Sequence, residues 1–87
     1  KTRTLFHAAI RHADVDTVRL FIDQGANVNL PDARGRSPLM HAVHMQRLDV
    51  VRLLINRGAD IKYEDETGLS ARDFAMMNGF QQAIPLL

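Results

Sequence analysis

The sequence contains no cysteine, carries almost no net charge and has no long apolar run. The absence of cysteine excludes disulfide bonds, thiol nucleophiles and thiolate metal sites. A net charge of +1 gives the chain no general attraction to nucleic acids or membrane surfaces. No apolar stretch approaches the roughly 20 residues that a membrane-spanning helix requires. With 46% hydrophobic and 24% charged residues, we expect residues 1–87 to form one ordinary soluble domain.

Sequence signatures of catalysis are also missing. There is no glycine-rich phosphate loop, no H-E-x-x-H pair and no nucleophile elbow around a serine. Carboxylates cluster only where turns or helix starts are expected, and solvated roles are typical there. These carboxylates are Asp14, Asp16, Glu64, Asp65 and Glu66. We therefore expect no enzymatic activity in this chain and no cofactor.

Four histidines are the remaining candidates for a metal site. His41 and His44 lie three residues apart on an expected helix, so both imidazoles could approach one ion. A third ligand would have to come from His7, His12 or an acidic residue, and no closed ligand set is visible. We therefore expect no metal at these residues. A metal-binding protein stays a weaker alternative.

A stretch of the sequence recurs after 33 residues. Residues 15–28, VDTVRLFIDQGANV, align with residues 48–61, LDVVRLLINRGADI, and the offset is fixed by Gly25 and Gly58. A fixed period of this size is typical of repeat proteins, in which each unit buries its apolar face against its neighbours. We expect units over about 1–31, 32–64 and 65–87.

Each unit is expected to contain two short helices and no strand. In the middle unit Ser37 is the predicted N-cap, Pro38 the first helical residue, and Gly58 ends the second helix. Thr4 is the predicted N-cap of the first helix of the chain. The apolar spacing predicts helices over 38–45 and 48–56, over 5–12 and 15–23, and over 71–77 with a last helix from 81.

These residues resemble the ankyrin repeat family over essentially the whole chain. The family pattern D-x-x-G-x-T-P-L-H-x-A-A, a break, then E-V-V-x-L-L-L-x-x-G-A-D-V-N is similar to residues 32–43 and 49–61. The resemblance implies an all-α solenoid of helix–turn–helix units joined by hairpin-like turns, with about two and a half to three repeats. It gives His7 a structural role in bonding neighbouring turns. Arg72 and Pro85 depart from the pattern, and they suit a C-terminal cap.

The resemblance implies a non-catalytic module that binds a partner protein or peptide, with no nucleic acid and no membrane involved. The partner would lie in a concave groove of turn tips and first helices. The groove positions are Arg3, Arg11, His12, Arg34, Arg36, His44, Met45, Glu66, Thr67, Leu69, Met77 and Asn78. Arginines prevail in the first two units and Glu64, Asp65 and Glu66 in the third. We therefore expect a polarised groove in which an acidic part of the partner faces units one and two.

An alternative is a regulatory or targeting domain of a larger enzyme or effector whose chemistry lies outside this chain. The chain begins at Lys1 rather than methionine, so we expect a processed product or a piece of a longer protein. The sequence leaves the compartment open, with the cytoplasm as the default expectation.

Overall fold

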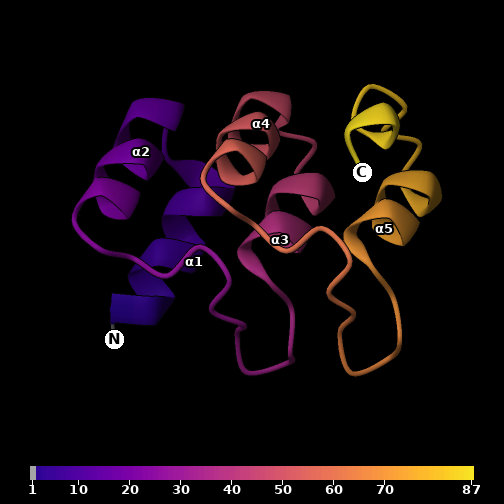
Figure 1. The fold of residues 1–87 in the computed structure, drawn as a ribbon, viewed down its shortest axis with the longest axis horizontal. Helices are drawn as coiled ribbons and strands as arrows, with labels where there is room; N and C mark the ends of the chain where they lie inside the picture. The colour runs from indigo at the N-terminus through magenta and orange to yellow at the C-terminus, as the bar shows by residue number, and fades with distance from the viewer. Residues whose placement is uncertain (1) are drawn as a thin grey trace.

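The computed structural model describes residues 2–87, with side chains from Leu5 onward. In this part of the chain two pairs of α-helices are followed by a fifth α-helix and a short 3₁₀ helix (Figure 1). The helices are α1 (Thr2–His12), α2 (Val15–Asp23), α3 (Pro38–His44), α4 (Leu48–Asn56), α5 (Ala71–Met77) and the 3₁₀ helix η1 (Ile84–Leu86). Among residues 2–87 the only β pairing is an isolated bridge between Glu64 and Ser70. The predicted all-α helix–turn–helix architecture is confirmed.

The middle of the chain follows the prediction closely. Helices α2, α4 and α5 have the predicted bounds, and α3 ends one residue early, at His44. Ser37 caps α3 by accepting the backbone N–H of Met40 at 3.2 Å, and Pro38 is its first residue. Gly58, with a φ of 96°, ends α4 in the left-handed conformation that a glycine adopts without strain.

The two ends of the chain differ from the prediction. Helix α1 begins at Thr2, so Thr4 lies within the helix and the predicted N-cap is wrong. Gly35 lies in the turn before α3, and Thr2 is the residue 33 positions earlier. Because residue 2 is not a glycine, the equivalent turn does not form there and the helix extends to Thr2. The predicted helix from 81 is also wrong, because residues 81–83 form turns before η1. Pro85 has no N–H to donate, and its ring would clash with the carbonyl four residues earlier in an α-helix.

The helices stack in two rows. Helices α1, α3 and α5 form one row, and α2 and α4 lie beside them in a second row (Figure 1). Helix α3 is central, because it contacts α1, α4 and α5. None of the helices in the described part of the chain is long and apolar enough to cross a membrane.

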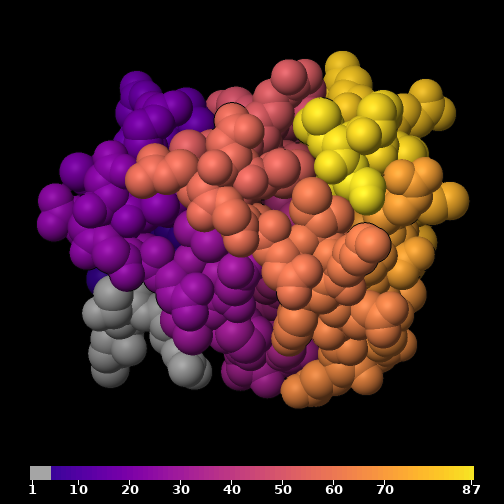
Figure 2. Space-filling view, in the orientation of Figure 1, coloured from indigo at the N-terminus to yellow at the C-terminus, as the bar shows by residue number. Residues whose placement is uncertain are grey.

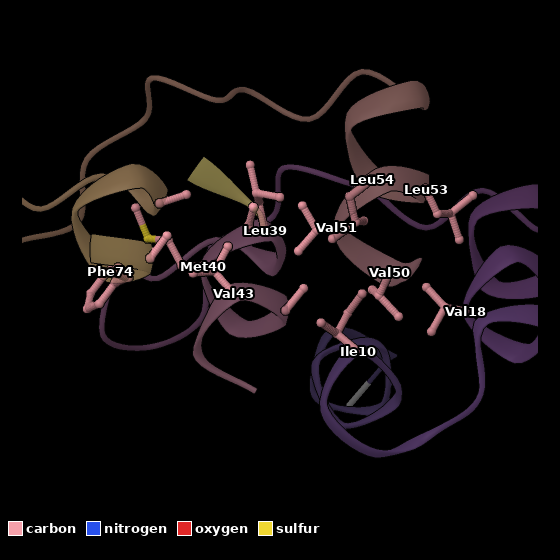
Figure 3. Close-up of a cluster of buried hydrophobic side chains, with 14 of the residues drawn as sticks. Ile10, Val18, Leu39, Met40, Val43, Val50, Val51, Leu53, Leu54 and Phe74 are labelled. Carbon is pink, nitrogen blue, oxygen red and sulfur yellow. The ribbon is translucent and has the colours of Figure 1, made fainter. Parts of the chain in front are cut away.

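The core runs continuously from one helix pair to the next. Side chains of all five α-helices meet in it, including Ile10, Val18, Val43, Val51 and Phe74 (Figure 3). Ile10 and Val43 are one period apart, as are Val18 and Val51, and all four are fully buried. Burial of such a side chain contributes roughly 1.5–3 kcal/mol, so the repeated positions hold the stack together. This frame fixes where the two projecting turns lie.

Candidate interaction surface

Two turns project from the row of α1, α3 and α5, one before α3 and one before α5 (Figure 1). In the first turn, residues 32–36, the backbone N–H of Asp32 donates to the Arg36 carbonyl at 2.8 Å. The Asp32 carboxylate accepts the backbone N–H groups of Arg34 and Arg36 at 2.8 and 2.9 Å. The aspartate therefore organises the turn and sets the direction in which the arginines leave it.

The second turn, residues 65–69, repeats this arrangement one period later. The Asp65 carboxylate accepts the backbone N–H groups of Thr67 and Leu69 at 2.8 and 3.1 Å. The hydroxyl of Thr67 donates to it at 2.6 Å and is the largest of the effects that lower the pKa of Asp65. Asp65 is buried, so it does not belong to the exposed acidic end that the sequence predicted. That part of the prediction is wrong, and only Glu64 and Glu66 are exposed there.

The two turns lie against each other, next to one another at the lower edge of the molecule in Figure 2. The phenol of Tyr63 donates to the Gly35 carbonyl at 2.6 Å. Gly35 has a φ of 78°, and a Cβ at this position would stand 2.9 Å from Cγ of Glu66. The absence of a side chain at residue 35 thus permits the second turn to approach the first.

Further hydrogen bonds join the segments that lead into the turns. Nε2 of the buried His7 donates to the Leu30 carbonyl at 2.9 Å, and the structural role predicted for His7 is confirmed. The Asn29 amide donates to the Gly58 carbonyl at 3.2 Å and accepts the Asp60 N–H at 2.7 Å. These bonds fix the turns relative to the helices, so surface side chains on the turns have defined neighbours.

An aspartate–histidine pair lies beneath the first turn. Nε2 of His41 is 2.7 Å from the second carboxylate oxygen of Asp32. Partial burial acts to raise the pKa of Asp32, but hydrogen bonds from Arg36, His41 and Arg34 outweigh it and the pKa is lowered. An ionised carboxylate only accepts, so Nε2 of His41 carries the hydrogen. Sequence reasoning missed this pair, because only the fold of the turn brings residues nine apart together.

The pKa of His41 is also lowered from its ordinary value of 6.5. Burial is the largest cause, since only 11% of the side chain is exposed and the charged imidazolium would lose its solvation. Asp32 acts in the opposite direction, and its effect on the pKa of His41 is larger than the smaller lowering effects of His7 and Arg11. Burial therefore outweighs the carboxylate partner and favours the neutral imidazole.

A pocket of about 380 Å³ opens between α1 and the first turn. It brings together three of the predicted groove residues, Arg11, Arg34 and Arg36. The remaining lining side chains are those of His7, Asp32, Ala33 and His41. The rings of His7 and His41 are 5.3 Å apart between centroids. We call this cavity, lined by these seven residues, the arginine pocket.

Arg36 is the most constrained of the three arginines. Its Nε lies 4.0 Å from the Asp65 carboxylate, and its guanidinium stands 5.5 Å above the ring centre of Phe74. A guanidinium over an aromatic face is held by the ring quadrupole as well as by the carboxylate. Arg36 therefore links the first turn to the second turn and to α5.

The other predicted groove residues fall outside the arginine pocket. Glu66 and Thr67 are exposed on the second turn, and Leu69 is half-buried against the core. The remaining ones are exposed at the C-terminal ends of α1, α3 and α5, which we call the inner helices. They are His12 on α1, His44 and Met45 at α3, and Met77 and Asn78 at α5. The side chain of Arg3 lies outside the described residues.

The histidines of α3 do not converge on one point. His41 is turned to Asp32, whereas His44 is exposed at the end of the helix. Among the residues with described side chains, no group of three or more histidines and carboxylates is arranged to hold a metal ion. The paired aspartate and histidine are thus a hydrogen-bonded structural contact at the edge of the arginine pocket.

The sequence of this chain is similar to those of known proteins. A family model described as ankyrin repeats (3 copies) matches residues 1–65. A stretch of 44 residues, 51% of this chain, is 39% identical to part of the ADP-ribosylation factor GTPase-activating protein AGD1 of Arabidopsis thaliana, and it covers 5% of that protein's length. Ankyrin repeats act in general as protein–protein interaction modules. The match spans most of the 87 residues, and the chain therefore belongs to the ankyrin repeat family.

Proposed function

We propose that this chain is a non-catalytic interaction module that binds a partner protein or peptide along its turns and inner helices. The arrangement of Arg11, Arg34 and Arg36 around one pocket carries this proposal. Arginine is suited to partner recognition because its planar guanidinium forms paired hydrogen bonds with carboxylates and phosphates. The partner segment would lie across the first turn and continue towards the second.

The charges along this path support a defined orientation of the partner. The first turn presents Arg34, and the second turn presents Glu66 with Glu64 beside it. An acidic part of the partner would face the first turn, and a neutral or basic part would face the second. In the opposite orientation the acidic part of the partner would face the acidic second turn, and the repulsion between like charges would disfavour that orientation.

Apolar contacts would supply much of the affinity. Met45 and Met77 are 39% and 66% exposed at the ends of α3 and α5. Methionine adapts to partner surfaces of varied shape, and its burial releases water from apolar surface. Exposed ion pairs contribute only about 0–1 kcal/mol each, so the arginines would serve mainly orientation and specificity.

Affinity capture with the intact chain tests this function. The groove variant combines Arg34→Glu with Met45→Ala, and its matched control is Arg52→Glu, which changes an exposed arginine on α4. We expect a captured protein to be retained by the wild type and by the control but lost by the groove variant. Equal capture by all three proteins would contradict the proposed surface.

A second candidate function is a regulatory or targeting domain within a larger enzyme or effector. The similarity to a short part of a GTPase-activating protein favours it, because 44 matched residues form only 5% of that protein. The complete open reading frame tests this candidate. An adjoining catalytic domain would support it, and an open reading frame with ankyrin repeats alone would refute it.

A further inference from the structure

We propose that the arginine pocket is an oxyanion site, which receives a carboxylate or phosphate group carried by a side chain of the partner segment. This inference rests on the proposed interaction function and assigns one anchoring point within it. The shared chemistry of the two groups is a cluster of anionic oxygens that accepts hydrogen bonds from guanidinium groups.

The hydrogen bonding of the lining residues favours an anion. Asp32 is the one acidic side chain in the lining, and its carboxylate is already engaged by two backbone N–H groups and by His41. Arg36 is held by Asp65 and Phe74. Within the described residues, Arg11 and Arg34 make no ion pair and no side-chain hydrogen bond. Two guanidinium groups at one pocket are therefore available to a ligand.

The arginines of the pocket are not part of the repeated pattern. Asp32 recurs 33 residues later as Asp65, which keeps the role of closing the turn. The three arginines do not recur as Arg or Lys: Arg11, Arg34 and Arg36 correspond to His44, Thr67 and Leu69. The repeat therefore does not require arginine at these positions, and in the described part of the chain the side chains of Arg11 and Arg34 make none of the contacts that hold the turns.

The cavity also suits one anionic group rather than a flat charged patch. Its volume of about 380 Å³ leaves room for a carboxylate or phosphate together with the first atoms of the side chain that bears it. Its lining includes His7, which is 4% exposed, and His41, whose side chain is 11% exposed. Partial removal of water strengthens the attraction between guanidinium and oxyanion relative to a fully exposed surface.

Peptide probes with the intact chain test the proposal. Three fluorescent peptides share a Gly-Ser frame and carry a central glutamate pair, a phosphoserine or a serine. Binding is measured by fluorescence anisotropy for the wild type, for Arg11→Gln with Arg34→Gln, and for the matched control Arg19→Gln with Arg52→Gln. The control removes the same charge from exposed positions on α2 and α4, and thermal unfolding verifies that each variant is folded.

We expect the serine peptide to bind weakly and at least one anionic peptide to bind measurably. The pocket variant should weaken that binding about tenfold or more, since it removes the charge-assisted hydrogen bonds of two guanidinium groups. The control variant should weaken it less than about threefold, because distant exposed charges are screened by salt. Comparison of the two anionic peptides identifies whether carboxylate or phosphate is preferred, and competition by inorganic phosphate shows whether the free anion suffices.

A second readout locates the ligand. An anion bound beside Arg11 and Arg34 should raise the pKa of His41, which NMR can follow, because negative charge favours the imidazolium. The groups that already face His41 are Asp32, His7 and Arg11. Equal loss in the pocket and control variants, or no binding of either anionic peptide, would overturn the oxyanion site. The interaction function would survive if captured partners were still lost by the Arg34 and Met45 variant, so the two proposals fail separately.

Discussion

Replacement of Gly35 by alanine tests how closely the two turns are packed. Two costs add at this position. The φ of 78° costs an L-residue roughly 1–2 kcal/mol, and the lower chain entropy of unfolded alanine offsets about 0.4–1 kcal/mol of this. The new Cβ would also stand 2.9 Å from Cγ of Glu66, and crowding of this kind typically costs about 1–3 kcal/mol. We expect Gly35→Ala to lower the free energy of unfolding by about 1–4.5 kcal/mol.

Gly58→Ala is the matched control, because Gly58 has a φ of 96° but no atom within 4 Å of the added Cβ. It should cost about 1 kcal/mol, from the backbone conformation alone. Urea unfolding at neutral pH measures both free energies. Glu66→Ala in the Gly35→Ala background should remove the excess cost, as a double-mutant cycle would show. Equal costs for both glycines, or no coupling with Glu66, would refute the packing described for the turns.

Three further predictions concern stability. Leu54→Ala should lower the free energy of unfolding by about 2–5 kcal/mol in urea titrations, because Leu54 is fully buried at the centre of the stack. Ser70→Ala should cost about 1 kcal/mol by the same measurement, since the Ser70 hydroxyl accepts the Asp73 N–H at 3.3 Å and donates to its carboxylate at 3.1 Å. Folding lowers the pKa of His41, so the unfolded chain binds this proton more readily than the folded chain. The free energy of unfolding should therefore fall as the pH drops below 6.5. Thermal unfolding between about pH 7.5 and 5.5 measures this pH dependence, and His41→Phe should reduce it.

The sequence predicted the fold well where the signal is local. Helices α2, α4 and α5 have the predicted bounds because each combines helical apolar spacing with a clear stop, such as Gly58 after α4. The prediction failed at the ends of the chain, where no such stop precedes α1. It could not foresee that Gln46, with a φ of 54°, would end α3 in the left-handed conformation that glycine takes after α2, α4 and α5.

The candidate site was predictable only in part, because its features arise between segments one period apart. The resemblance to ankyrin repeats placed Arg11, Arg34 and Arg36 on one predicted surface, and these three line a single pocket. The burial of Asp65 next to Arg36 could not be predicted from the sequence, where Asp65 lies between two exposed glutamates. It follows from the packing of the two turns against each other. The contact of His41 with Asp32 likewise depends on the path of the first turn.

NMR mapping of the glutamate-pair peptide on the isotope-labelled chain shows which surface receives a partner segment. We expect the largest chemical-shift changes on the first turn and around Arg11 and His41, with a smaller set at the second turn. Residues on the exposed sides of α2 and α4, such as Arg19 and Arg52, should not change. Shifts concentrated on α2 and α4, or spread evenly over all exposed arginines, would contradict an interaction surface built from the turns and inner helices.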